Sequence, residues 1–146
     1  MASIKIVTSD KDINNCHSVM CQLRPHIAVE DFLSLVKTQM QQGYRLAYVE
    51  QGGAPVACAG YRCSQNLAWG KFLYVDDLIT DEGQRSKGYG KLLLEWLRQQ
   101  ARENDCAQLE LDSGLQRKDA HRFYEREAMA MTSYHFSSKL YTAAWL

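Results

Sequence analysis

The stretch from Gln84 to Lys91 reads QRSKGYGK, and it constrains the fold more than any other part of the sequence. It separates the apolar run VDDLIT from the amphipathic run LLLEWL, so it predicts a strand, a glycine-rich loop and a helix in that order. The first amides of a helix have no partner within the helix, and they carry a partial positive charge. A loop of this kind therefore predicts an anion-binding cradle at the carboxyl end of a strand.

The glycines and cations of this loop suit a phosphate ligand. Gly88 and Gly90 permit positive φ and leave room beside the backbone, while Arg85 and Lys87 add charge-assisted contacts. The loop matches neither the G-x-x-x-x-G-K-[ST] pattern of a P-loop nor the G-x-G-x-x-G pattern of a dinucleotide site. An ordinary solvated turn is the alternative interpretation.

Hydrophobic periodicity predicts ten elements along the chain. Strands are predicted at 4–7, 44–50, 56–62, 69–80, 108–112 and 131–140. Helices are predicted from the cap-like SDKD at 9–12 to just before Leu23, and at 30–42, 88–104 and 118–127. The order β-α-α-β-β-β-α-β-α-β indicates an α/β fold, a mixed sheet with helices on its faces.

Composition narrows the range of partners. The chain has 146 residues, which suits one domain, and its 17 basic and 17 acidic residues give no net charge. A nucleic-acid or membrane binder usually has a basic excess, so neither partner is expected. No apolar run approaches the roughly 20 residues of a membrane span, and the start MASIKIVTSD has no signal-peptide pattern. A cytoplasmic protein is expected.

The five cysteines are odd in number and have no C-x-x-C spacing. This pattern predicts reduced, mostly buried thiols. No metal site is expected.

Two motifs resemble those of the GCN5-related N-acetyltransferases (GNAT). One is R-x-x-G-x-G at Arg85–Gly90, which follows a strand ending in an acidic and apolar run; the other is AHRFYE at Ala120–Glu125, similar to the family's A-x-x-F/L-Y-E. The resemblance covers nearly the whole chain. It implies a GNAT-like, mostly antiparallel central sheet flanked by helices on both faces, and a single N-acetyltransferase domain over residues 1–146.

The resemblance also implies how acetyl-coenzyme A (acetyl-CoA) binds. Amides of the loop would hold its pyrophosphate, and a strand edge would pair with its pantetheine arm. A bulge near Asp76 and Asp77 would splay that strand from the one at 108–112 and make a V-shaped slot. Arg117 stands where the family often has Asn, so it would reach a phosphate or be solvated. The implied cofactor-binding residues are Leu78, Ile79, Thr80, Arg85, Ser86, Lys87, Gly88, Tyr89, Gly90 and Arg117.

The implied chemistry is direct attack of an amine on the thioester in a ternary complex. Tyr124 occupies the position of the family's tyrosine, so it would act as the general acid that protonates the thiolate; the alternative is a core aromatic beside Phe123. Asp77 is the predicted base, with Asp76, His26 or water as alternatives. Strand alternation places the two aspartates on opposite faces. Either carboxylate could instead pair with a loop arginine or with the backbone.

Three functions fit these patterns. The first is an acetyl-CoA-dependent N-acetyltransferase whose acceptor is a small-molecule amine or a protein amine. The second is a non-catalytic acyl-CoA-binding or regulatory module of the same fold. The third is a different nucleotide-binding enzyme, such as a methyltransferase, which the cationic loop disfavours because a methyl donor has no pyrophosphate. The stretch Asp112–Gly114 lines the acceptor slot or forms a turn.

The apolar tail at 141–146 predicts docking on the chain's own core or on a partner, and family likeness makes a homodimer plausible.

Overall fold

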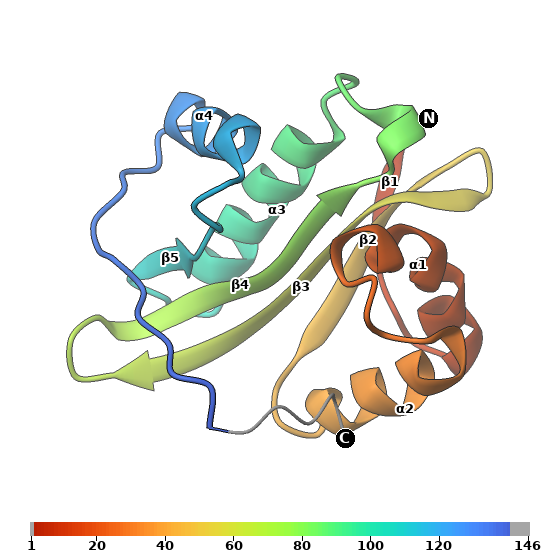
Figure 1. The fold of residues 1–146 in the computed structure, drawn as a ribbon, viewed down its shortest axis with the longest axis horizontal. Coiled ribbons are helices and arrows are strands. Elements are labelled where there is room, and N and C mark those ends of the chain that lie inside the picture. The colour runs from red at the N-terminus through yellow and green to blue at the C-terminus, as the bar shows by residue number, and fades with distance from the viewer. Residues whose placement is uncertain (1, 141–146) are drawn as a thin grey trace. The chain divides into compact units, whose positions relative to one another are not determined.

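The structure is a computed structural model in which residues 2–140 are described, and it divides into two compact units, residues 1–111 and 112–146. The elements of the first unit are β1 (Ser3–Ile6), α1 (Asp10–Leu23), α2 (Val29–Met40), β2 (Arg45–Gln51), β3 (Ala54–Asn66), β4 (Gly70–Thr80), the 3-10 helix η1 (Glu82–Gln84), α3 (Tyr89–Glu103) and β5 (Gln108–Leu111). The second unit contains α4 (Lys118–Arg126). Figure 1 shows the course of the chain.

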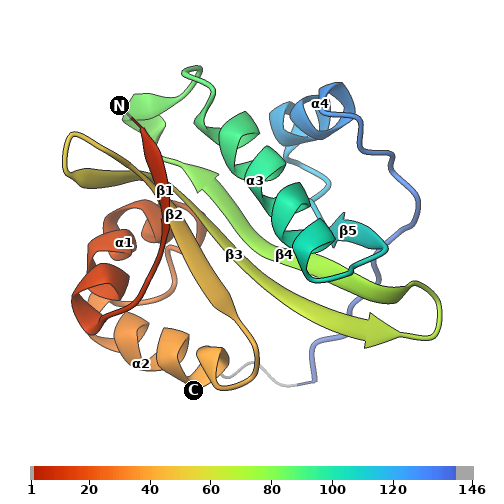
Figure 2. The ribbon, with the colours of Figure 1, turned by 180° about the vertical axis from the view of Figure 1, so that it is seen from behind.

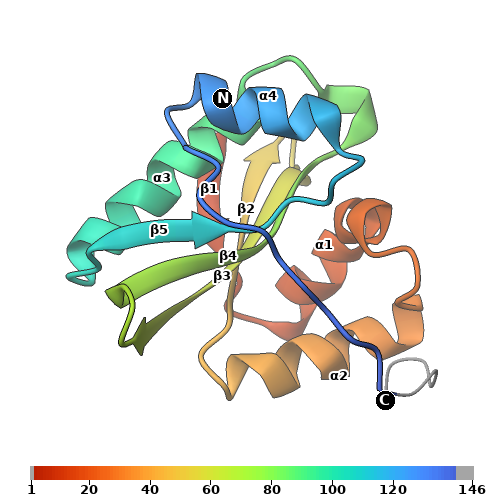
Figure 3. The same ribbon diagram turned by 60° about the vertical axis from the view of Figure 1, so that its left-hand side comes forward.

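One five-stranded sheet organises the first unit. Its strand order is β1-β2-β3-β4-β5, and every neighbouring pair is antiparallel except β4 and β5, which are parallel. Helices α1 and α2 cover one face and α3 covers the other (Figure 3). The predicted fold class, a mixed and mostly antiparallel sheet with helices on both faces, is confirmed.

Strand β2 shows why both faces of the sheet are covered by helices. Leu46 and Tyr48 belong to the core cluster that includes α1 and α2, whereas Ala47 and Val49 belong to the cluster under α3. Alternate residues of a strand point to opposite faces, so a strand buried on both sides reads as a continuous apolar run. All four side chains are buried.

The helix boundaries follow from local chemistry. The Ser9 hydroxyl caps α1 by accepting a hydrogen bond from the Asp12 amide at 3.1 Å, and the helix ends one residue before Arg24. After α2, Gly43 adopts φ 98°, and its amide donates to the Met40 carbonyl at 3.2 Å. None of the helices in residues 2–140 is long and apolar enough to cross a membrane.

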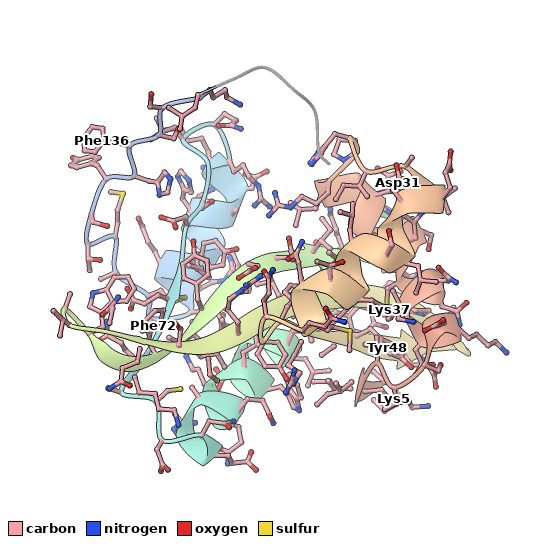
Figure 4. The ribbon with its side chains drawn as sticks, turned by 90° about the horizontal axis from the view of Figure 1, so that it is seen from below. Lys5, Asp31, Lys37, Tyr48, Phe72 and Phe136 are labelled. Atoms are coloured by element: carbon pink, nitrogen blue, oxygen red, sulfur yellow. The ribbon has the colours of Figure 1, made fainter. Side chains whose placement is uncertain are left out.

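The predicted last strand is wrong, because residues 131–140 contain neither strand nor helix. Their large apolar side chains are 77–90% exposed, and Figure 4 shows Phe136 pointing away from the segment that carries it. Alternating apolar residues indicate β propensity, but a strand also needs a neighbouring strand to pair with. The predicted docking tail at 141–146 lies outside the described residues.

The prediction of mostly buried cysteines is also wrong. Cys16 and Cys58 are buried, Cys21 and Cys106 are half-buried, and Cys63 is exposed. Cys63 lies on β3 beyond Tyr61, the last residue of β3 that pairs with β2. The missing neighbour explains its exposure.

Tyr61 links the core to the alkaline stability of the protein. Its buried ring packs edge-to-face on Trp96 with centroids 5.6 Å apart, and burial raises the pKa of Tyr61 to about 12. Between pH 10 and 12 the unfolded phenol is ionised while the folded one keeps its proton. The stability that this group provides below pH 10 is therefore lost as pH rises toward 12, at about 1.4 kcal/mol per pH unit.

We expect Tyr61→Phe to remove this contribution. Urea unfolding between pH 9 and 11.5 should show a shallower loss of stability in the variant than in the parent protein. Identical slopes in the two proteins would contradict the assignment.

Candidate functional site

A β-bulge interrupts β4 at Asp76. In the register with β3, Asp77 lies opposite Gly60 and Val75 lies opposite Tyr61, so Asp76 has no partner of its own. The bulge that the family resemblance implied near Asp76 and Asp77 is therefore present.

The two neighbours of β4, which are β3 and β5, separate at this bulge. Pairing between β4 and β5 ends with Val75 opposite Leu111, whereas β4 continues to pair with β3 as far as Thr80 opposite Ala57. Among the described strands, β3 alone pairs with the last residues of β4. The other edge of Leu78–Thr80 has no strand partner among the described residues, so its backbone groups can bind a ligand.

Asp77 is held on the face covered by α1 and α2. Its Oδ1 accepts a hydrogen bond from Arg24 Nε at 3.0 Å, and its Oδ2 accepts one from the Tyr44 hydroxyl at 2.8 Å. Arg24 also donates from Nη2 to the Asp76 carbonyl at 2.9 Å, so it bridges the bulge itself. The alternative that an aspartate here pairs with a loop arginine is thus realised.

Asp76 has an arginine of its own. Arg62 donates to its Oδ2 from Nη2 at 2.6 Å and from Nε at 3.0 Å, and Arg62 Nη2 also donates to Gln39 Oε1 at 3.1 Å. Burial raises the pKa of Asp76, and the hydrogen bonds from Arg62 oppose that shift. The guanidinium lies 5.5 Å from the centre of the Tyr44 ring.

These contacts place both carboxylates on the face of α1 and α2. The expectation that Asp76 and Asp77 lie on opposite faces is wrong, because the bulge adds one residue and breaks the alternation between them. Sequence reasoning also missed Tyr44 and Arg62, since no local pattern marks residues that meet across strands. His26, the other candidate base, is exposed in the turn between α1 and α2.

The loop after β4 has the backbone of an anion cradle. Ser86 and Gly88 adopt positive φ, 65° and 86°, and α3 begins at Tyr89. Figure 2 shows the loop from β4 leading into α3. The first hydrogen bond of α3 runs from the Leu92 amide to the Gly88 carbonyl at 3.0 Å. Within residues 2–140, the amides from Gly88 to Lys91 have no backbone acceptor.

Side chains fix the start of this cradle. Gln22 of α1 donates from Nε2 to Asp81 Oδ1 at 2.7 Å, and its Oε1 accepts from the Glu82 amide at 2.9 Å. Lys87 Nζ donates to Gln84 Oε1 at 2.9 Å, and Arg85 is exposed. The loop is thus anchored at its start and leaves two cations beside its amides. No sequence pattern marked Gln22 as a contact of this loop.

The second unit contains Tyr124, which is the predicted general acid. Tyr124 is half-buried on α4 with its ring centre 5.4 Å from that of Phe123. Burial raises the pKa of Tyr124, and the charge of Arg117 acts in the opposite direction. Arg117 caps α4, and its amide donates to the Gly114 carbonyl at 3.0 Å. The buried hydroxyl of Ser113 has no hydrogen-bond partner among the described residues.

Comparison with known proteins shows the family of this chain. The model of the acetyltransferase (GNAT) family matches residues 13–128, most of the chain. The chain belongs to the GNAT family. It is 34% identical over 138 residues to the uncharacterized N-acetyltransferase YhdJ of Bacillus subtilis, which covers 93% of this chain and 97% of that protein. The chain is therefore an acyltransferase.

Solved structures agree with the fold. A putative acetyltransferase from Agrobacterium tumefaciens has a TM-score of 0.81 at 20% identity, covering 94% of this chain and 99% of that one. AAC(6')-Iy, in complex with the bisubstrate analogue CoA-S-monomethyl-acetylneamine, has a TM-score of 0.85 at 10% identity, covering 97% of this chain and 99% of that one. At such low identity these GNAT structures bear on the fold alone.

Gly60 makes the contacts around Asp77 possible. A Cβ at this position would lie 1.9 Å from the Tyr44 hydroxyl and 2.4 Å from Asp77 Oδ2. We expect Gly60→Ala to destabilise the protein by about 1–3 kcal/mol, because the tyrosine or the carboxylate must move.

The matched control is Gly83→Ala. A Cβ at Gly83 would meet only Asp81 Oδ2, at 3.7 Å, so its effect should stay within about 0.5 kcal/mol. Denaturant unfolding compares the two variants. Equal stabilities would contradict the close packing of Tyr44 on Asp77.

Proposed function

We propose that the chain transfers an acetyl group from acetyl-CoA to an amine by direct attack in a ternary complex. One observation carries the proposal: the strand edge released by the bulge leads into a loop whose last amides, from Gly88 to Lys91, lack backbone acceptors. A ligand with a pyrophosphate and an amide-bearing arm suits this succession. Acetyl-CoA has both groups.

Different residues would bind different parts of acetyl-CoA. Amides from Arg85 to Gly90 would hold the pyrophosphate, with the cations of Arg85 and Lys87 beside it. The free edge of Leu78–Thr80 would pair with the pantetheine arm. Since that arm continues from the phosphates, the thioester would lie toward the bulge. Arg117 remains a proposed phosphate ligand.

Tyr124 is the proposed general acid. In the transfer a bond forms between the amine nitrogen and the acetyl carbon, the carbon–sulfur bond breaks, and the thiolate takes a proton. Burial raises the pKa of Tyr124, so its phenol is protonated at neutral pH, as a general acid must be. A backbone amide at the bulge would stabilise the oxyanion.

Asp77 stays the proposed base. Both of its oxygens already accept one hydrogen bond, from Arg24 and from Tyr44. Each carboxylate oxygen can accept a second bond, so Asp77 would receive the proton of the amine through a water molecule. Asp76 and His26 remain the alternatives.

The acceptor is proposed to be a cationic amine, on a small molecule or on a protein. Glu110 of β5 lies opposite Tyr74 in the register, and alternation places it on the face away from Leu109 and Leu111, which pack with α3. Its Oε2 accepts a hydrogen bond from Gln108 Nε2 at 3.0 Å. Glu110 would thus add a negative charge to the same face as Asp76.

A matched pair of glycine variants tests the cradle. Gly88 and Gly53 have similar φ, 86° and 80°, and neither would bring a Cβ within 4 Å of another group. Gly88→Ala and Gly53→Ala should therefore cost similar stability. We expect saturating acetyl-CoA, at 100 times its Kd, to stabilise the parent and Gly53→Ala by about 2.7 kcal/mol, and Gly88→Ala much less.

Thermal unfolding with and without acetyl-CoA measures this difference. No stabilisation of the parent protein would contradict cofactor binding altogether. Equal stabilisation of both variants would contradict the cradle as the binding site while leaving the cofactor in place.

Tyr124→Phe tests the general acid. We expect kcat to fall by about 100-fold, because the thiolate loses its proton donor, while stabilisation by acetyl-CoA is retained. Release of free thiol with a panel of amines gives the rate. Unchanged kcat would contradict the role of Tyr124, and binding without thiol release for any amine would favour the non-catalytic module.

A further inference from the structure

Four of the five cysteines lie in two pairs with opposite environments. Cys16 and Cys58 are both fully buried in the core, and the hydrogen bond between them raises the pKa of Cys58. Cys63 and Cys106 are 43 residues apart in sequence, and their sulfur atoms lie 3.8 Å apart where Cys63 is exposed. An oxidant in solution can therefore reach the second pair and not the first.

The environments of Cys63 and Cys106 determine which of the two thiols reacts first. The Cys106 thiol donates a hydrogen bond to the Cys63 sulfur, and its own burial and that hydrogen bond raise the pKa of Cys106. The proton thus stays on Cys106. Cys63, exposed and accepting this hydrogen bond, is the better placed nucleophile.

We propose that Cys63 and Cys106 form a reversible disulfide when the protein meets a peroxide. The Cys63 thiol first loses its proton to solvent, and the thiolate attacks an oxygen of hydrogen peroxide. An S–O bond forms, the O–O bond breaks, and the departing hydroxide takes a proton from solvent to leave as water. Cys106 sulfur then attacks the sulfenic acid, the S–S bond forms, and hydroxide leaves with the Cys106 proton as a second water. The two thiols are oxidised and one hydrogen peroxide is reduced.

The two sulfur atoms must move closer together to form the bond. A disulfide needs a sulfur–sulfur distance of about 2.0 Å, so the two atoms must approach by roughly 1.8 Å from their present 3.8 Å. Cys106 lies in the connection from α3 to β5, outside both elements. Side-chain rotation and a small adjustment of this connection can supply the approach.

The disulfide would fasten β5 to the sheet. Cys63 lies opposite Leu73 in the register of β3 and β4, and Cys106 precedes Ala107, whose amide donates to the Lys71 carbonyl of β4 at 2.7 Å. The bond would therefore link β3 to the start of β5 across β4. Since β5 has only four residues, a covalent anchor should slow its detachment.

Oxidation of the intact protein tests the proposal. The protein is reduced, freed of reductant and treated with hydrogen peroxide, then mapped by mass spectrometry. We expect it to lose two hydrogen atoms in mass, to yield a peptide linking Cys63 to Cys106, and to gain about 5–10 °C in Tm. Dithiothreitol should reverse all three changes.

Serine variants separate the two roles. Cys106→Ser should leave a sulfenic acid on Cys63 that dimedone traps, whereas Cys63→Ser should give neither trapping nor a link. Cys21→Ser, at a half-buried cysteine outside both pairs, should behave like the parent. Oxygen added to Cys63 without a link, a link between two molecules, or a link to another cysteine would overturn the proposal.

Discussion

Two carboxylates on adjacent residues, both on the same face of a sheet, are the constraint around which the first unit is built. Asp76 and Asp77 repel each other, and each is removed in part from water, so neither is stable there without a partner. Arg24 from the end of α1 and Arg62 from β3 supply the opposite charges. The charges thereby tie α1 to the sheet beside the apolar contacts of the core.

The bulge that creates this pair also divides β4 into two parts. Before Asp76 the strand is paired on both sides, and after it the strand has β3 alone as a neighbour among the described strands. Pairing on one side keeps Leu78–Thr80 straight enough to remain a strand and leaves the other edge available. Gly60 allows the arrangement, because any larger residue would occupy the position of the Tyr44 hydroxyl.

Local chemistry explains which features the sequence could predict. The strand–loop–helix junction at Arg85–Gly90 and the cap at Ser9 depend on neighbouring residues, and both are present. The faces of Asp76 and Asp77 could not be predicted, because a bulge depends on the register of two strands. The last strand failed for a similar reason: alternation at 131–140 reports propensity and not the presence of a partner. Tyr44 meets Asp77 across 33 residues, which no short pattern encodes.

Hydrogen exchange with and without acetyl-CoA tests the central claim most directly, that the free edge of β4 and the cradle bind one ligand. Amides that gain an acceptor exchange more slowly. We predict that saturating acetyl-CoA slows exchange in the peptides that contain Leu78–Thr80 and Arg85–Gly90 together. Protection confined to other parts of the chain, or no protection of these two segments, would contradict the account.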